Sequence, residues 1–190
     1  MLITHAMPIR PPVQSSARFA PRRPVVEPLL TRSGVELSMR AIQPDDAPAL
    51  VRAFARLTTD QVRMRLFYSM TDLPLDVARQ LCEVNPSRIA AFVVTLPGDR
   101  EILAEARLVV DRSAAMAEFA IVVDQRWTGV GIAHALMTRL IDEARQRGVS
   151  ELWGDVLADN RPMLDLLQRL GFERESHSDD HGIVRASFAL

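Results

Sequence analysis

Apolar and polar side chains alternate in several short runs of the chain, and each run predicts a β-strand. The first run is 35–41, where every second residue is apolar. Short turns separate the next runs, which predicts an antiparallel meander of strands. The expected strands after the first are 89–96, 101–110, 117–123, 150–157, 172–178 and 183–190.

Between these runs the apolar residues follow the period of a helix. From 133 to 144 they recur at steps of three and four residues, which predicts an amphipathic helix over 130–147. Thr58 and Gln61 have the spacing of a capping box, so a helix should start just after them. That helix is expected to cover 59–67. The remaining helices are expected to begin near Pro44, to cover 75–83 and to begin at Asn160.

The order of these elements predicts a mixed α/β (α+β) domain with a mostly antiparallel sheet of about seven strands. One connection is different, because strand 117–123, helix 130–147 and strand 150–157 form a parallel crossover. Such a crossover is right-handed in nearly all proteins. A ligand is expected at its mouth, where the first strand turns into the helix.

The first 30 residues hold six of the chain's twelve prolines, and four arginines against a single acidic residue. Because proline lacks an amide proton and has a fixed φ angle, this density predicts neither helix nor sheet over 1–30. We therefore expect a flexible arm at 1–30 and a single domain at 31–190. A transit peptide, and an arm that embraces a second copy in a homodimer, are open alternatives for the arm.

Charge and cysteine content narrow the class of protein. A net charge of −1 over 190 residues argues against broad nucleic-acid binding, which requires a basic surface. Apolar runs are too short to span a bilayer, and one cysteine, Cys82, excludes an internal disulfide or a cysteine zinc cluster. All 23 basic residues are arginine, so the chain offers no lysine amine. We expect a reduced, cytoplasmic setting with neither membrane nor nucleic acid as partner.

The segment 126–131, Arg-Trp-Thr-Gly-Val-Gly, leads from a strand into the long helix. Gly129 and Gly131 let backbone N–H groups approach an anion at the helix N-terminus, so a phosphate or diphosphate is the expected ligand. A Rossmann fingerprint is excluded because His134 stands at its third glycine position, and a P-loop is excluded because it requires lysine.

This segment resembles the acetyl-CoA loop of the GNAT superfamily of N-acetyltransferases, whose pattern is Arg/Gln-x-x-Gly-x-Gly/Ala. Asn160 and the pair Gly171-Phe172 match the superfamily's pattern at the start and end of the following helix. With the element order, the resemblance covers 35–190 and implies helices on both faces of the sheet. The segments that look like the catalytic domain of bacterial Pat-type protein lysine acetyltransferases are 40–68, 117–124 and 158–172.

The resemblance implies acetyl-CoA as co-substrate and assigns residues to hold it. The pantetheine arm would pair with the end of strand 117–123, and a main-chain N–H there would face the thioester oxygen. The expected contacts are the main chain of Val122 or Val123 for this arm, the side chains of Arg126 and Asn160, and the main-chain N–H groups of Trp127, Thr128, Gly129, Val130 and Gly131 for the phosphates.

Glu118 is the candidate general base. Alternation places it on one face of an interior strand with Ala120, where a carboxylate is costly unless it faces a cleft. Partial burial would raise its pKa toward neutrality. In Pat-type enzymes the glutamate in this context is the proposed base, and the resemblance carries that role onto Glu118, with Glu105 as the reserve. Leu167 stands where many superfamily members have a tyrosine acid.

The predicted function is transfer of an acetyl group from acetyl-CoA to a primary amine, a protein lysine or a small amine, by direct attack in a ternary complex. Acetylation of an antibiotic or polyamine is an alternative, and so is a catalytically silent acyl-CoA sensor. No metal is expected. His134 is interpreted as a helix-face residue and Cys82 as a small packed hydrophobic residue. The possible metal ligands His177, Asp179, Asp180 and His181 are interpreted as residues of a hairpin turn.

Overall fold

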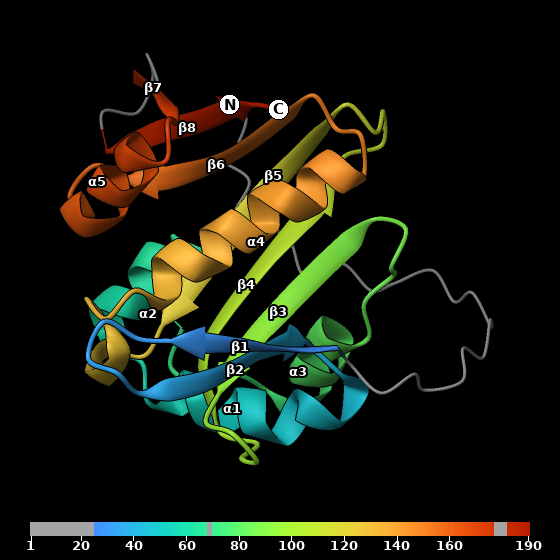
Figure 1. Cartoon of the computed structure of the whole chain (residues 1–190), viewed down its shortest axis with the longest axis vertical. Coiled ribbons are helices and arrows are strands. Elements are labelled where there is room, and N and C mark those ends of the chain that lie inside the picture. Colours follow the sequence, from blue (N-terminus) through green and yellow to red (C-terminus); the bar gives the residue numbers. More distant parts are fainter. Residues whose placement is uncertain (1–24, 68–69, 177–181) are drawn as a thin grey trace.

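The computed structural model describes residues 25–67, 70–176 and 182–190. Within these ranges the strands form one eight-stranded sheet in the order β1-β2-β3-β4-β5-β6-β8-β7 (Figure 1). The strands are β1 Val26–Leu30, β2 Glu36–Ala41, β3 Ile89–Thr95, β4 Ile102–Val110, β5 Met116–Val123, β6 Glu151–Leu157, β7 Glu173–Ser176 and β8 Ile183–Ala189.

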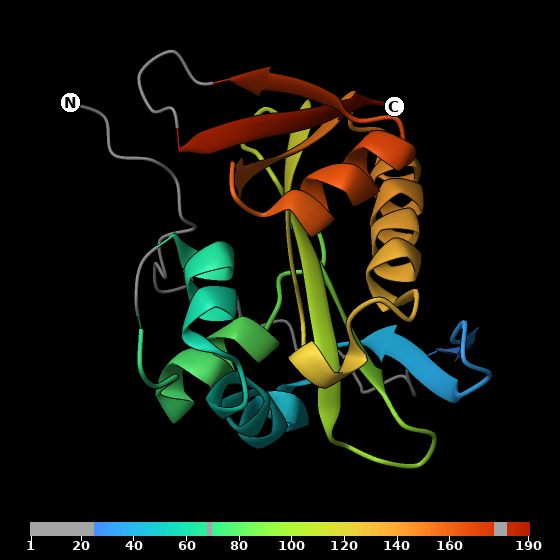
Figure 2. The same cartoon turned by 90° about the vertical axis from the view of Figure 1, so that its left-hand side faces the viewer.

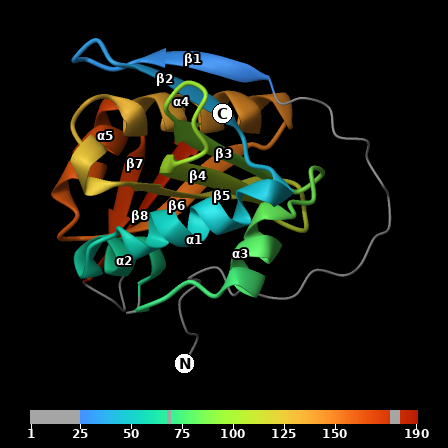
Figure 3. The same cartoon turned by 90° about the horizontal axis from the view of Figure 1, so that it is seen from below.

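Helices cover both faces of this sheet. Helices α1, α2 and α3 lie on one face, and α4 and α5 lie on the other, as the views in Figures 2 and 3 show. The helices are α1 Ala47–Ala55, α2 Thr59–Leu66, α3 Leu75–Cys82, α4 Ile132–Gln146 and α5 Arg161–Arg169, with 3-10 turns at Pro44–Asp46 and Gln125–Trp127.

The strand pairing confirms the predicted fold class. Neighbouring strands from β1 to β5 are antiparallel, and so are the pairs β6–β8 and β7–β8. Strands β5 and β6 are parallel and are joined through α4, which is the expected crossover. Thr58 and Gln61 also form the expected capping box, with the Thr58 hydroxyl accepting from the Gln61 N–H at 3.2 Å.

The prediction that 1–30 excludes a sheet is wrong for 26–30. These residues form β1 and pair with β2, with Pro28 opposite Ser38. Proline is tolerated because β1 is the edge strand, where a missing N–H need not break a ladder bond. This strand is also the reason why the sheet exceeds the expected number by one. The rest of the expected arm, 1–24, and the possible metal ligands at 177–181 lie outside the described residues.

The main core lies between the sheet and helices α4 and α5. Leu136, Met137, Leu140 and Ala144 of α4 are completely buried, which confirms the apolar stripe expected from the period of the sequence. A second cluster packs under α1 and α3 and includes Cys82. No helix among the described residues has both the length and the apolar character needed to cross a bilayer.

Candidate active site

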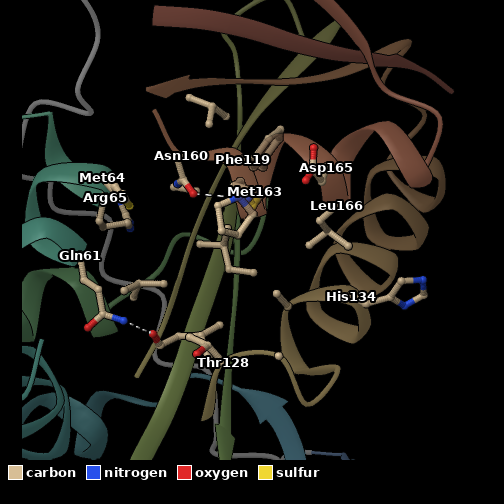
Figure 4. Close-up of a pocket in the computed structure, with 18 of the residues that line it drawn as sticks. Gln61, Met64, Arg65, Phe119, Thr128, His134, Asn160, Met163, Asp165 and Leu166 are labelled. Carbon is tan, nitrogen blue, oxygen red and sulfur yellow. Dashed lines mark hydrogen bonds between the residues drawn. The ribbon is translucent and has the colours of Figure 1, made fainter. Parts of the chain in front are cut away.

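The parallel strands β5 and β6 are paired at one end and apart at the other. Their paired residues are Met116 with Glu151, Ala117 with Leu152 and Glu118 with Trp153. Beyond these pairs the two strands separate, and a cavity of about 630 Å³ opens beside the gap. Figure 4 shows its walls: Gln61, Met64 and Arg65 of α2 lie on one side, and residues of α4 and α5 lie on the other.

The separated end of β5 directs main-chain groups into this gap. The Asp124 N–H donates to the Leu103 carbonyl at 2.8 Å, which fixes the phase of the antiparallel ladder between β4 and β5. Residues that bond to β4 alternate with residues that face away from it. The N–H and C=O groups of Phe119, Ile121 and Val123 therefore face the gap, where an extended ligand could pair with them.

The main-chain groups of Val122 and Val123, the two residues expected at the pantetheine arm, point in opposite directions from β5. Val122 lies in phase with Asp124, so its N–H faces β4. Val123 faces the gap, and its carbonyl accepts a hydrogen bond at 2.7 Å from the Gln61 side chain of α2. Of the two residues, Val123 is therefore the one whose N–H faces the gap.

A glycine-containing turn links β5 to α4 at the other wall of the cavity. Gly129 has a φ of 76° and Gly131 a φ of 105°, values that side-chain-bearing residues rarely adopt. Gly131 is the residue immediately before the helix, and both glycines line the cavity. The first N–H groups of α4 have no acceptor inside the helix, so the turn presents donors and a partial positive charge to an anion.

Hydrogen bonds within the turn show which of the expected amides are free to bind a phosphate. The Trp127 N–H donates to the Asp124 carbonyl at 2.8 Å, and the Thr128 N–H donates to the Gln125 carbonyl at 3.3 Å. These two amides are already used. The donors that remain for a ligand begin at Gly129 and continue into the first turn of α4.

Both the side chain and the main chain of Arg126 are bonded to Asp124 at the start of the turn. Its Nη2 lies 2.7 Å from Asp124 Oδ2, and its main-chain N–H donates to Asp124 Oδ1 at 3.0 Å. Asp124 is buried and also accepts from Arg56 Nε at 3.0 Å. Hydrogen bonds from Arg126, reinforced by the one from Arg56, hold the pKa of Asp124 well below its usual range. In this structure the guanidinium of Arg126 is thus paired with Asp124, and its contact with a phosphate stays a prediction.

Glu118 lies at the last pairing of β5 with β6 and lines the same cavity. Its pKa is raised from 4.5 to about 7, chiefly because burial disfavours the charged form and secondarily because Asp155 is nearby. Arg65 and Arg185 act in the opposite direction. A carboxyl group with this pKa can accept a proton near neutral pH, which is the requirement for a general base.

Residues 54–172 match the model of the acetyltransferase (GNAT) family. The chain belongs to the GNAT family. It is 29% identical over 145 residues to Acetyltransferase Pat of Mycolicibacterium smegmatis, a match that covers 76% of this chain and 43% of that protein. It is 35% identical over 85 residues to the ribosomal protein bS18 alanine N-acetyltransferase of Escherichia coli, which covers 45% of this chain and 55% of the relative.

The chain therefore spans about half the length of these two curated relatives. Among solved structures, the GNAT domain of S. lividans PAT superposes with a TM-score of 0.79 at 24% identity, over 87% of this chain and 97% of that domain. That likeness shows the GNAT fold. The resemblance to the GNAT superfamily and to Pat-type proteins, which the sequence motifs suggested, is confirmed.

Within the GNAT cavity, Arg32 is a wall residue that sequence reasoning missed. Its N–H donates to the Val130 carbonyl at 3.0 Å, so the turn between β1 and β2 rests against the glycine turn. Its Cγ lies 3.9 Å from the position that a Cβ at Gly131 would occupy. Arg32 is exposed and lines the cavity, which places a guanidinium beside the expected phosphate site. No local pattern could indicate this, because the contact joins two distant segments.

Glu105, the reserve base, has a different environment in the GNAT fold. It is buried, and its carboxylate lies 2.5 Å from Arg107 Nε and 3.7 Å from Arg65 Nη2. It lines a second cavity of about 100 Å³ under α1 and α3, not the cavity beside the gap. Glu105 therefore forms ion pairs with two guanidinium groups and lies apart from the cavity in which the base is expected.

Asn160 and Leu167 differ in their access to the GNAT cavity. Asn160 lines the cavity and caps α5, with its Oδ1 accepting from the Met163 N–H at 3.3 Å (Figure 4). Its side-chain NH₂ group can still donate to a ligand. Leu167 is completely buried in the main core. Tyr68, the single tyrosine of the chain, lies outside the described residues.

The other residues considered from sequence have these positions. Trp127 is half-buried, lines the cavity and packs against the main core, and His134 lines the cavity from the exposed side of α4. Cys82 is buried in a core cluster, which confirms a packed side chain, and burial raises its pKa to about 12. Within the ranges that the structure describes, no three His, Cys, Asp or Glu side chains are grouped to hold a metal ion.

Proposed function

We propose that this chain is an acetyl-CoA-dependent N-acetyltransferase whose acceptor is a primary amine of a protein, with a lysine side chain as the first choice. The observation that carries the proposal is the position of Glu118 at the point where β5 and β6 separate. From there its side chain projects from the face of the sheet that α2 covers, whereas the glycine turn and α5 lie on the opposite face. Donor and acceptor would thus enter from opposite faces and meet at the gap.

Each part of the cavity supports one requirement of acyl transfer. The main-chain donors from Gly129 onward and the Arg32 guanidinium suit the phosphates of acetyl-CoA. The outward-facing groups of Ile121 and Val123 suit the extended pantetheine arm, and Asn160 offers a further polar contact. Holding the thioester in one orientation converts the reaction with a bound amine into an effectively unimolecular step.

The chemistry that we propose proceeds without a covalent enzyme intermediate. Glu118 takes a proton from the bound ammonium group, and the free amine attacks the thioester carbonyl carbon. A carbon–nitrogen bond forms, and the Val123 N–H stabilises the negative charge that develops on the carbonyl oxygen. The carbon–sulfur bond then breaks, and the nitrogen gives up a second proton, which the leaving thiolate takes to become the free thiol. Glu118 afterwards releases its own proton to solvent. A thiolate is a weak enough base to leave without a tyrosine acid at position 167.

Two resemblances favour different protein amines. The resemblance to Pat-type protein lysine acetyltransferases supports a lysine acceptor, and the similarity to the bS18 alanine N-acetyltransferase makes an N-terminal α-amine the second candidate. The lysine proposal takes precedence because the match to Pat covers more of this chain. Small amines and a silent acyl-CoA sensor remain as the outcomes of a test.

The test measures release of free thiol from acetyl-CoA with a lysine peptide, a peptide with N-terminal alanine and a polyamine as separate acceptors. We expect turnover with the lysine peptide and at least a tenfold loss in the Glu118→Gln variant. Turnover confined to the alanine peptide would replace the lysine assignment. Binding of acetyl-CoA by calorimetry without turnover of any amine would support the sensor, and absence of binding would refute the whole proposal.

A further inference from the structure

A second carboxylate accompanies Glu118 at the open end of the gap. Glu118 and Trp153 are partners in the parallel ladder, so their side chains project from the same face of the sheet. Asp155 is two positions farther along β6, at a distance of about 6.6 Å along the strand, and leaves that face as well. Both carboxylates line the cavity. The α2 face of the opening therefore carries two acidic groups from two different strands.

Asp155 is held firmly in this position. Its side chain is 4% exposed, and its oxygens accept from Arg185 Nε at 3.1 Å and from Arg185 Nη2 at 3.3 Å. Arg185 lies opposite Asp155 in the ladder of β6 with β8, and its guanidinium stacks 4.1 Å above the Trp153 ring. A carboxylate can accept about four hydrogen bonds, so Asp155 keeps capacity for a ligand in the cavity.

The charges around Glu118 leave it without a cation of its own. Arg185 of β8 is bonded to Asp155, and Arg65 of α2 lies 3.7 Å from Glu105. Glu105 is shared with Arg107 of β4. Among the described residues, Glu118 forms no ion pair, although it faces Asp155, Arg65 and Arg185. Two carboxylates close together disfavour a second negative charge unless a cation lies between them.

The wall next to the two carboxylates is apolar. Met64 of α2, Phe67 directly after α2, and Ala120 and Val122 of β5 line this cavity. An aliphatic chain could lie against these side chains while its charged end reaches the acidic groups. A neutral polar molecule would leave Glu118 without a positive charge beside it, whereas Asp155 already has Arg185.

We propose that Asp155 is a specificity-determining residue, which together with Glu118 binds the acceptor as an alkylammonium ion. This inference rests on the proposed function. The ammonium group enters between the two carboxylates, donates hydrogen bonds to both and transfers one proton to Glu118. Asp155 remains bonded to Arg185 and keeps the amine in place while its nitrogen attacks the thioester. The predicted acceptor is therefore a cationic amine on an aliphatic chain.

The proposal can be tested without turnover by using n-butylammonium as the probe and 1-butanol as its neutral counterpart. The readout is the carboxyl carbon resonance of Glu118 in protein labelled at glutamate, assigned by its loss in Glu118→Gln. In the unmodified chain we expect saturable changes with n-butylammonium and none with 1-butanol. In Asp155→Asn we expect at least tenfold weaker binding of n-butylammonium. We also expect the pKa of Glu118 to fall by about one unit, because a nearby negative charge has been removed.

Two further variants separate a binding role from a structural one. Asp155→Glu keeps the charge and should bind n-butylammonium within threefold of the unmodified chain. Asp142→Asn removes a half-exposed charge on α4 and should change neither the binding nor the pKa of Glu118. In turnover, Asp155→Asn should raise the KM for the lysine peptide at least tenfold and leave the dissociation constant of acetyl-CoA unchanged.

Equal binding of n-butylammonium by Asp155→Asn and the unmodified chain would overturn the proposal, and so would equal binding of 1-butanol and n-butylammonium. If the chain acetylates no amine, the proposed function fails. The probe experiment still decides whether the two carboxylates form an ammonium site, because it requires no acetyl transfer.

Discussion

Replacing Glu118 with glutamine should make the protein less active and, above neutral pH, more stable. Burial raises the pKa of this carboxyl from 4.5 to about 7, so the folded state favours its neutral form. The unmodified chain therefore has the full benefit of this group below pH 4.5 and loses it as pH rises through 7. Glutamine cannot ionise, so the variant does not incur this loss.

The size of the effect follows from the shift in pKa. One pKa unit corresponds to about 1.4 kcal/mol, so the rise from 4.5 to about 7 gives at most about 3 kcal/mol at pH 8. For a chain of this length, that free energy corresponds to an increase in Tm of about 6–12 °C. At pH 4 the two proteins should have nearly the same Tm, because the carboxyl group is neutral in both the folded and the unfolded chain.

The activity of the variant should change in the opposite direction. In the unmodified chain, about one tenth of Glu118 is ionised at pH 6 and about nine tenths at pH 8, so kcat/KM should rise roughly tenfold between them. Glu118→Gln should lose about a hundredfold in kcat/KM at pH 8 and lose this dependence on pH.

The assays are thermal unfolding at pH 4 and pH 8 and thiol release between pH 6 and pH 8. Glu36→Gln makes the same chemical change at an exposed position of β2 and should change neither quantity. A Tm at pH 8 that is equal to or below that of the unmodified chain would refute the reasoning about burial. Full activity in Glu118→Gln would refute the assignment of the base.

Three further predictions concern the coenzyme site and the buried thiol. Gly131→Ala forces a side chain into a φ of 105° and should weaken acetyl-CoA binding about tenfold in calorimetry, whereas Gly98→Ala, at a φ of 74° between β3 and β4, should leave binding unchanged. Arg32→Gln should raise the dissociation constant of acetyl-CoA about fivefold at low salt, with a smaller effect at high salt and none in the exposed-site control Arg112→Gln. Cys82, 1% exposed and with a pKa of about 12, should react with a thiol reagent after unfolding but not before, and rapid reaction of the folded chain would contradict its burial.

The parts of the site that the sequence revealed are those that are local in the chain. The strand with Glu118, the glycine turn and α4 follow one another directly, so their periodicity and spacing indicated both the cavity and its position. Arg126 was the local exception. Its partner Asp124 stands two residues earlier and forms an ion pair with this guanidinium, which the pattern had suggested only for a phosphate. The Asp-x-Arg spacing was the available signal.

The parts that the sequence did not reveal depend on contacts between distant segments. Arg32 reaches the glycine turn from the turn between β1 and β2, and Gln61 reaches Val123 from α2. Asp155 had no distinguishing local pattern, because its importance arises from the ladder that brings β6 beside Glu118. The strand containing Pro28 was missed because residue composition does not show that a segment will lie at the edge of a sheet.

The short pairing of β5 with β6 has a consequence for how the molecule tolerates change. Three residue pairs between β5 and β6 join the five strands β1 to β5 to the three strands β6 to β8. Helix α4 packs against strands on both sides of this pairing and so links the two parts of the sheet. A proline substituted near residue 152 would remove a ladder hydrogen bond from this short pairing and weaken the link between the two parts of the sheet. In the edge strand β1, by contrast, Pro28 is accommodated. The opening in which the chemistry is proposed to occur therefore lies beside the shortest strand pairing of the described sheet.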